Sequence, residues 1–167
     1  MTKILTQILA VTVIFLAGIG NLAAQGVSNS SPATLSGQDY EEIKALYARY
    51  NQGSDFRDTE LFLSAFAEDA VMTRGGRDIE GMDALRADRQ ARYQGQTGDV
   101  GRRHLNSSFL ITPTENGARS KAYYVLVDVT VRPQTIISSG YYHDEFVRTA
   151  AGWKIKHRTL FTDAPTQ

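Results

Sequence analysis

Side chains that change their charge near neutral pH are few in this chain of 167 residues. It contains three histidines, His104, His143 and His157, and no cysteine. Histidine changes its charge most readily near neutral pH, which suits it to act as a general base. The lack of cysteine rules out disulfides, thiolate nucleophiles and cysteine-ligated metals. Proton transfer by an imidazole is therefore the first chemistry to consider.

The sequence carries no convincing signature of a metal or cofactor site. The three histidines fall on three different predicted strands and lack E-x-x-H spacing, so they form a weak ligand set. A phosphate-binding loop and a dinucleotide fingerprint are both missing. We therefore expect a reaction that uses neither a metal nor a cofactor.

One carboxylate stands at an unusual place in the pattern. Asp55 lies in the stretch YNQGSDFRD, residues 50–58, between two segments that are typical of helices, and Tyr50 precedes it by five residues. An aspartate at such a break is usually a cap or a turn former. The residues alone leave this role open beside a role in a site.

Helices are predicted on both sides of Asp55. Ser36 and Asp39 form an S-x-x-D capping box ahead of the first, and Gly53 is expected to end it. The apolar face of this helix has spacings of three, four and three: Tyr40, Ile43, Tyr47 and Tyr50. Asp58 is expected to cap the second helix, over residues 59–67. The buried stripe of that helix is Leu61, Phe62, Ala65 and Phe66. A third, over residues 82–93, is rich in Arg and Asp and should be exposed on one side.

The segments outside these helices, from residue 69 to residue 161, are predicted to form strands. A short strand over residues 69–76 comes first, and longer ones follow over 102–112, 118–132, 135–149 and 153–161, with a bulge expected at Gly140. Alternation in the first long strand places Asn106 and Ser108 on the face of His104 and the apolar residues on the other: Leu105, Phe109 and Ile111. Helices followed by an antiparallel meander indicate an α+β fold, with a strongly bent sheet packed on the helices around a pocket.

The N-terminal residues predict export. Lys3 precedes an apolar run of about a dozen residues and then small residues, which is the order of a signal peptide. The run is short for a membrane anchor. We expect cleavage after Ala24, a flexible leader over residues 25–35, one domain over 36–163, and a periplasmic or secreted protein without membrane attachment.

Charge argues against a nucleic-acid partner. The chain has 18 basic and 18 acidic side chains, so it lacks the basic excess that binding nucleic acid requires.

Beyond these patterns, the mature chain resembles the SnoaL-like branch of the nuclear-transport-factor-2-like (NTF2-like) superfamily. Residues 39–72 are similar to the opening helical pair of that family, which ends in F-x-x-D-A. Residues 139–158 are similar to its closing hairpin, with G-x-Y-x-D-x-x-x-R followed by G-W-x-I-x-x-R. The resemblance implies a cone-shaped fold that hosts dehydratases, isomerases, cyclases, dioxygenase subunits and non-enzymatic binders.

Within that superfamily, the chain is most similar to the group of scytalone dehydratase, a bile-acid dehydratase and hexachlorocyclohexane dehydrochlorinase. Asp55 matches the aspartate that follows the first helix of these enzymes, and His104 matches a histidine that begins a sheet strand. Tyr50 matches a tyrosine of the bile-acid dehydratase. The resemblance implies that Asp55 orients His104 as a general base, and that Tyr50 donates a hydrogen bond to a carbonyl or leaving hydroxyl. The alternatives are that Asp55 is a cap, that His104 is a surface histidine and that Tyr50 fills the core.

The remaining candidates keep two roles each. Arg148 matches the strand arginine of the family and either pairs with a carboxylate or lines the pocket. His143 either replaces a second catalytic histidine of scytalone dehydratase or belongs to a sheet surface or subunit contact, and His157 is expected in the core or an interface. Asn106 suits a polar cavity wall or an exposed face. Aromatic residues that either line the pocket or fill the core are Phe62, Phe66, Tyr124, Tyr142 and Trp153.

The combined prediction is a lyase that eliminates water or a similar group from a small hydrophobic substrate, a class that includes cyclic compounds. An isomerase or cyclase with the same base, and a non-catalytic binder of small apolar ligands, are the alternatives. A homodimer or homotrimer is expected, because Val125, Val127, Val129 and Val131 would form an apolar outer sheet face. That face packing on the helices is the other possibility.

Overall fold

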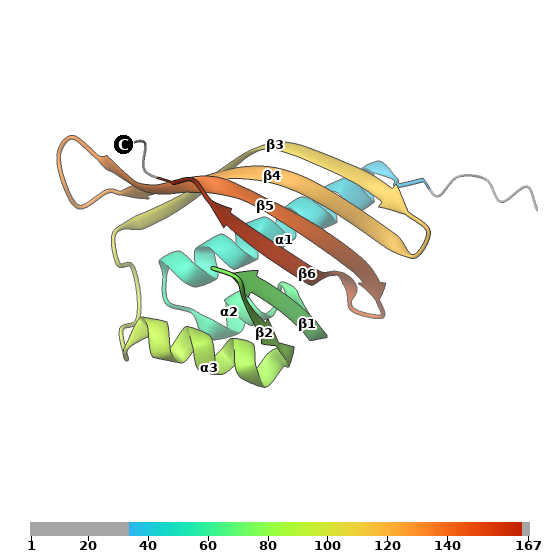
Figure 1. Ribbon diagram of the computed structural model, residues 1–167, viewed down its shortest axis with the longest axis horizontal. Helices are drawn as coiled ribbons and strands as arrows, with labels where there is room; N and C mark the ends of the chain where they lie inside the picture. The colour runs from blue at the N-terminus through green and yellow to red at the C-terminus, as the bar shows by residue number, and fades with distance from the viewer. Residues whose placement is uncertain (1–33, 165–167) are drawn as a thin grey trace, which may run out of the picture. The chain divides into compact units, whose positions relative to one another are not determined.

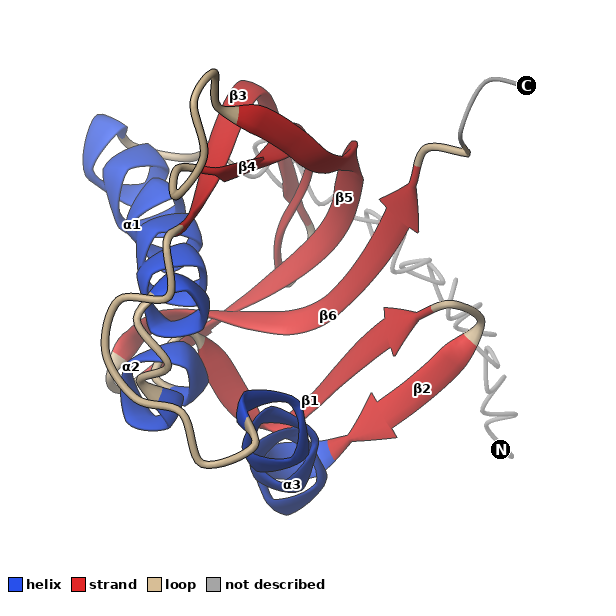
Figure 2. Cartoon of the chain, turned by 90° about the vertical axis from the view of Figure 1, so that its left-hand side faces the viewer, coloured by secondary structure: helices blue, strands red, loops and turns tan. Residues whose placement is uncertain are grey.

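Helices and a curved sheet form the part of the chain that the computed structural model describes, residues 34–164. The helices are α1 (Gly37–Asp55), α2 (Thr59–Leu63) and α3 (Gly81–Tyr93). The strands are β1 (Phe66–Arg74), β2 (Arg77–Glu80), β3 (Arg102–Thr114), β4 (Gly117–Asp128), β5 (Thr135–Thr149) and β6 (Gly152–Thr162). Figures 1 and 2 show the sheet curving around α1, with α3 beside β1 and β2.

The six strands form one sheet in the order β2-β1-β6-β5-β4-β3. Strands β3 to β6 are an antiparallel meander, as the sequence predicts. Strand β1 pairs with β6 in parallel, so the sheet is mixed rather than wholly antiparallel. The α+β fold with helices packed on a bent sheet is confirmed.

Helix α1 starts as the sequence predicts and ends later. The Ser36 side chain accepts from Asp39 N–H, and Asp39 Oδ2 accepts from Ser36 N–H at 2.8 Å. The prediction that Gly53 ends the helix is wrong, because the helix continues to Asp55. A Cβ on residue 53 would lie 2.4 Å from the backbone nitrogen of Phe62. Glycine is therefore required here by the close approach of α2.

Helix α2 is shorter than predicted. Asp58 caps it as expected, accepting from Leu61 N–H at 2.9 Å, but the helix ends at Leu63 and β1 begins at Phe66. The apolar stripe that predicted one continuous helix is divided between two elements. Both parts are buried, because Phe62 and Phe66 pack on each other with ring centroids 5.2 Å apart.

Two irregularities in the sheet change which side chains face α1. The register of β3 against β4 shifts between Ser107 and Leu110, where Ser108 has φ 54°. Simple alternation therefore fails there: Ser108 is exposed, while Phe109 packs edge-to-face on Tyr47 at 4.9 Å. In contrast, the bulge expected at Gly140 is absent, because that residue keeps regular partners on both sides.

The second irregularity is in β6. Phe146 pairs with Ile155 and Glu145 with His157, so Lys156 is an extra residue. His157 consequently leaves the core face, and its Nε2 lies 2.9 Å from the hydroxyl of Thr73. The expectation that His157 lies in the core is wrong for this reason, and its place in an interface stays a prediction.

The outer face of the sheet is partly apolar, and two of the four predicted valines belong to it. Val125 and Val127 lie in β4 and are half-buried, but β4 ends at Asp128, so Val129 and Val131 lie in the following connection. The large exposed apolar residues of β3 to β6 are Leu105, Leu110, Tyr123, Ile136, Ile137 and Phe161. The homo-oligomer stays a prediction.

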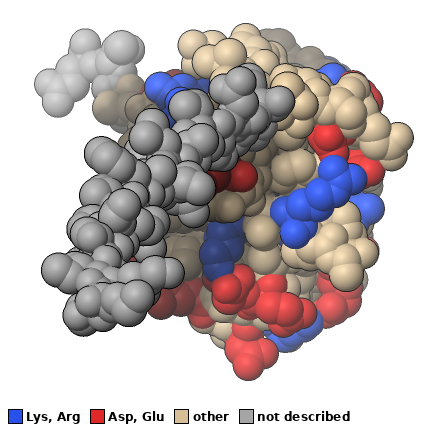
Figure 3. All heavy atoms as spheres, turned by 90° about the vertical axis from the view of Figure 1, so that its right-hand side faces the viewer, with Lys and Arg blue, Asp and Glu red and all other residues tan. Residues whose placement is uncertain are grey.

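On the face in Figure 3, acidic and basic side chains are interspersed with uncharged ones.

Two predictions concern membranes and export. Within residues 34–164, no helix is long and apolar enough to cross a membrane. The signal peptide and most of the leader lie outside the described residues.

The packing of Gly53 gives a testable prediction. Replacing Gly53 by Ala should destabilise the protein by about 1–3 kcal/mol, because the new Cβ must displace the backbone of Phe62. Gly37, in the same helix, has nothing within 4 Å of the corresponding position, so Gly37→Ala is the matched control. Urea denaturation measures both, and equal stabilities of the two variants would contradict this packing.

Candidate active site

Asp55 and His104 are in direct contact. The ring Nδ1–H of His104 donates to Asp55 Oδ1 at 2.5 Å, and the backbone N–H of His104 donates to Asp55 Oδ2 at 2.9 Å. The side chain of Asp55 is 5% exposed and that of His104 is 16% exposed. One buried carboxylate therefore fixes both the backbone and the ring of the histidine.

The position of Asp55 at the last residue of α1 is not that of a helix cap. A helix C-terminus carries partial negative charge, so a carboxylate there is electrostatically unfavourable without a partner. Asp55 caps neither helix: Phe56 follows α1 at its C-cap, and Asp58 caps α2. Its two oxygens instead accept the two N–H groups of His104.

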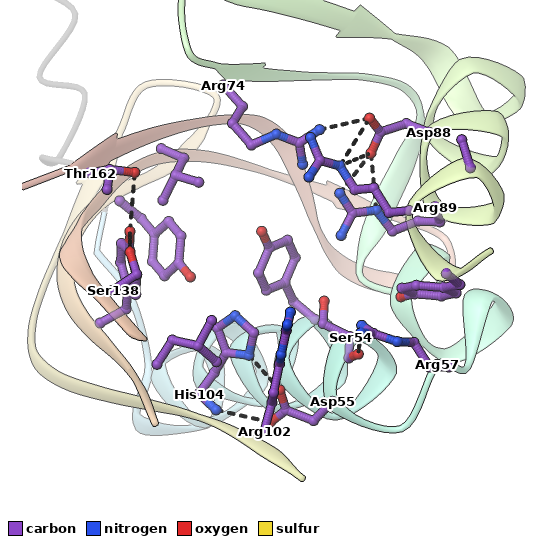
Figure 4. Close-up of a pocket in the computed structure, with 18 of the residues that line it drawn as sticks. Ser54, Asp55, Arg57, Arg74, Asp88, Arg89, Arg102, His104, Ser138 and Thr162 are labelled. Atoms are coloured by element: carbon purple, nitrogen blue, oxygen red, sulfur yellow. Dashed lines mark hydrogen bonds and ion pairs between the residues drawn. The ribbon is translucent and has the colours of Figure 1, made fainter. Parts of the chain in front are cut away.

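A cavity of about 640 Å³ opens beside this pair. Its walls come from α1, α3 and strands β1, β3, β4, β5 and β6. With Nδ1 engaged by Asp55, Figure 4 shows the other ring nitrogen of His104 directed into the cavity. A neutral imidazole held in this orientation can accept a proton through Nε2.

Three predicted tyrosines line the cavity: Tyr50, Tyr124 and Tyr142. The rings of Tyr50 and His104 lie 6.4 Å apart between centroids, so the phenol and the imidazole border the same space. Tyr124 and Tyr142 stack at 5.0 Å. Burial raises the pKa of Tyr142 well above its usual value, so this phenol remains a hydrogen-bond donor.

An ion pair without solvent exposure lies behind these tyrosines. Arg158 Nε and Nη2 donate to the two oxygens of Asp144, both at 2.8 Å, and both side chains are 0% exposed. The guanidinium lies over the rings of Tyr50 and Tyr142 at 4.2 Å each. Tyr47 of α1 donates to Asp144 at 2.5 Å. This cluster ties α1 to strands β5 and β6.

Titration of this buried cluster follows its surroundings. Burial, then the negative charge of Asp144, raises the pKa of Tyr47 far above its usual value. Burial opposes the charge of Arg158, but the neighbouring Asp144 outweighs it and raises the pKa of Arg158. Tyr47 therefore stays protonated and Arg158 stays charged across the accessible pH range.

Five of the seven predicted substrate-binding residues lie outside the cavity wall: Phe62, Phe66, Asn106, His143 and Arg148. Phe62 and Phe66 are buried in the core, because α2 and the start of β1 pack beneath Tyr50. Asn106 accepts from Asn51 of α1 at 2.5 Å and donates to the carbonyl of Tyr123. His143 lies on the other face of the sheet, tilted against Tyr141 at 5.3 Å.

Arg148 also lies away from the cavity. Its guanidinium donates to Asp39, which also accepts from Trp153 Nε1 at 2.8 Å. Of the two predicted roles, the structure places this arginine in the pairing one. The carboxylate of the capping box thus anchors the first turn of α1 to β5 and β6.

Sequence reasoning missed the charged part of the cavity wall. Five arginines line it: Arg57, Arg74, Arg89, Arg92 and Arg102. The helix over 82–93 was expected to expose its charged residues, yet Arg89 is 5% exposed. The available signal was its spacing of four from Leu85 and from Tyr93, which places all three on one buried face.

Metal ligation finds little support in this geometry. Residues 34–164 contain no group of three or more His, Asp or Glu side chains arranged to hold a metal ion.

This combination of helices, an unclosed bent sheet and a cavity defines an NTF2-like, cystatin-like fold. The chain belongs to the SnoaL-like family, because the model of the SnoaL-like domain matches residues 36–159. A comparison with curated proteins gives no match.

Solved structures share the fold. A Nostoc punctiforme protein of unknown function with a cystatin-like fold has a TM-score of 0.71 and 23% identity over 80% of this chain and 97% of its own. An aspartate-to-asparagine variant of a Mycobacterium tuberculosis protein of unknown function has a TM-score of 0.66 and 28% identity, over 75% of this chain and 77% of its own. A Novosphingobium aromaticivorans protein provisionally named a scytalone dehydratase has a TM-score of 0.62 and 23% identity, over 76% of this chain and 85% of its own.

The buried ion pair gives a second prediction. Asp144→Ala should destabilise the protein by about 3–5 kcal/mol, because Arg158 would remain buried without a counter-charge. Glu41→Ala breaks the exposed pair of Glu41 with Lys44 and is the control, expected to have a much smaller effect. Chemical denaturation followed by circular dichroism measures both. Equal losses in the two variants would show that the buried pair is not a special constraint.

Proposed function

We propose that this protein is a lyase whose general base is His104, acting on a small ring-containing substrate held in the cavity. The observation that carries the proposal is the contact of Asp55 with the Nδ1 side of the His104 ring, which leaves Nε2 facing the cavity. A carboxylate in that position favours the Nδ1–H tautomer and stabilises the imidazolium formed when Nε2 accepts a proton. The family likeness and the provisional dehydratase name of one structural neighbour support the reaction class.

The proposed reaction balances without an external reagent. His104 Nε2 accepts a proton from a carbon adjacent to a carbonyl, and the carbon–hydrogen electron pair forms the new carbon–carbon double bond. The bond from the neighbouring carbon to its hydroxyl breaks, and the hydroxyl takes both electrons. The imidazolium then returns its proton to this group, which leaves as water, and His104 is neutral again.

Tyr50 is proposed to assist by hydrogen bonding. Its phenol borders the same cavity as His104, so it can donate to the substrate carbonyl or to the leaving hydroxyl. A donor aimed at developing negative charge typically contributes about two to three orders of magnitude in rate. The aromatic rings of Tyr124 and Tyr142 supply a face for the apolar part of the substrate.

The first test of this proposal removes the base. His104→Ala should lower turnover by about 10²–10⁴-fold and leave ligand affinity within about tenfold, because a general base acts mainly in the transition state. His143→Ala is the matched control, since this histidine lies on the other sheet face. A panel of hydroxylated cyclic ketones, terpenoids and hydroxy acids supplies the substrates. Turnover that survives in His104→Ala would refute the mechanism, and ligand binding without any turnover would favour a binder.

The second test concerns the orienting carboxylate. Asp55→Asn should lower kcat by a factor comparable to His104→Ala while the fold remains intact, because an amide supplies no charge and can stabilise the wrong tautomer. A cap role predicts the opposite, since asparagine caps helices about as well as aspartate. Turnover and thermal melts of the same samples separate the two. Full activity in Asp55→Asn would show that the contact with His104 is only structural.

A further inference from the structure

Positive charge is concentrated in the cavity wall, although the whole chain has a formal charge of zero. The lining contains five arginines and two aspartates, Asp55 and Asp88. With His104 neutral, the lining has an excess of three positive charges. A cavity built only for an apolar substrate would not need this excess, because buried charge is costly unless it is paired.

The two aspartates are already engaged. Asp88 of α3 accepts from Arg74 at 2.7 Å, from Arg89 at 2.6 Å, from Arg92 at 3.2 Å and from Arg77 at 3.4 Å, so one carboxylate is shared by four guanidinium groups. Asp55 is held by His104. Neither aspartate accepts a hydrogen bond from the remaining arginines of the wall, Arg57 and Arg102.

Arg57 lines the cavity, and its guanidinium is held in a fixed position. It has φ 59°, a left-handed conformation that is uncommon for a residue with a side chain. Its Nη1 donates to the carbonyl of Ser54 at 3.0 Å, and its guanidinium lies 4.9 Å from the ring centroid of Tyr93. Its Nε is buried and has no hydrogen-bond partner among residues 34–164. Burial, then the charge of Arg102, lowers the pKa of Arg57.

Arg102 places a second guanidinium beside the base. It lies two residues before His104 in β3, so alternation puts both side chains on the same face of the strand. Figure 4 shows Arg57 and Arg102 on the side of the cavity that holds His104 and Asp55, across from Arg74, Asp88 and Arg89.

We propose that the substrate is an organic acid whose carboxylate is bound by Arg57 and Arg102. This inference deepens the proposed lyase function, because it assigns a substrate class to the same cavity. A guanidinium matches the planar, two-oxygen shape of a carboxylate with parallel hydrogen bonds. The apolar body of the acid then lies against Tyr124, Tyr142 and the nearby leucines, with a reacting carbon next to His104.

The single charge of a carboxylate matches the local charge beside His104. Arg57 and Arg102 place two positive charges on that side of the cavity and Asp55 places one negative charge, which leaves an excess of one. A monoanion neutralises this excess, whereas a doubly charged phosphate would bring a second negative charge close to Asp55.

Three probes that share one ring system test the inference: 2-naphthoate, 2-naphthamide and 2-naphthyl phosphate. Titration calorimetry on the wild-type protein should show 2-naphthoate binding at least about tenfold more tightly than the amide, the size expected for a charge-assisted hydrogen bond. Arg102→Gln and Arg57→Gln should each remove most of this preference. Arg102 is exposed, so replacing it should leave the fold intact, which circular dichroism checks.

Arg103→Gln is the matched control. Arg103 is the next residue of the strand and pairs with Asp99 at 2.6 Å, outside the cavity lining, so it should keep the full preference. An amide that binds as tightly as the acid, a phosphate that binds more tightly, equal losses in Arg102→Gln and Arg103→Gln, or no binding of 2-naphthoate at millimolar concentration would each overturn the inference.

The lyase proposal and the acid preference can fail separately. His104→Ala should keep the preference for 2-naphthoate over 2-naphthamide, because the base is not needed to bind the carboxylate. A protein whose His104→Ala variant keeps full turnover would refute the lyase mechanism and leave the acid preference standing. A wild-type protein that turns over neutral substrates and shows no preference for the acid would refute the acid preference and leave the lyase mechanism standing.

Discussion

The ion pair of Arg158 with Asp144 is the constraint on which the rest of the structure depends. Both side chains are 0% exposed, and removing ions from water is costly unless their hydrogen bonds are well made. Two parallel bonds at 2.8 Å and the phenol of Tyr47 meet most of this need, and only Arg158 Nη1 lacks a hydrogen-bond partner among residues 34–164. Because Tyr47 belongs to α1 and the ion pair to β5 and β6, the helix is fixed against the concave face of the sheet.

The placement of α1 determines the cavity. Tyr50, one turn after Tyr47, lies over the guanidinium of Arg158 and forms part of the wall. The same helix ends at Asp55, which contacts the ring of His104 in the cavity wall. The tyrosine and the aspartate of the proposed site are thus positioned by one rigid helix, which is more accurate than placement on loops. The arginines add a charge that the core does not require.

Much of this could be predicted from sequence, for reasons that particular residues make clear. The capping box at Ser36, the Asp58 cap and the meander depend on local patterns, and the structure confirms them. Errors arose where a tertiary contact overrides the pattern: Gly53 stays helical because α2 packs against it. The bulge near Ser108 reverses an alternation that is regular in the sequence.

The candidate site divides in the same way. The contact of Asp55 with His104 joins residues 49 positions apart, and only resemblance to a family indicated it before the structure was known. Asp144 and Arg158 stand in the quoted family motifs, yet their pairing at the centre of the core depends on the register of β5 and β6. Convergence of the five arginines from four different segments has no local signal at all.

The most direct measurement of the central claim needs no substrate. Nitrogen-15 NMR of the His104 ring, recorded at a pH at which the ring is neutral, reports which nitrogen carries the proton. The account predicts the Nδ1–H tautomer, with the proton directed at Asp55 and Nε2 free to act as a base. An Nε2–H tautomer would contradict it, because that nitrogen could not then accept a proton from the substrate.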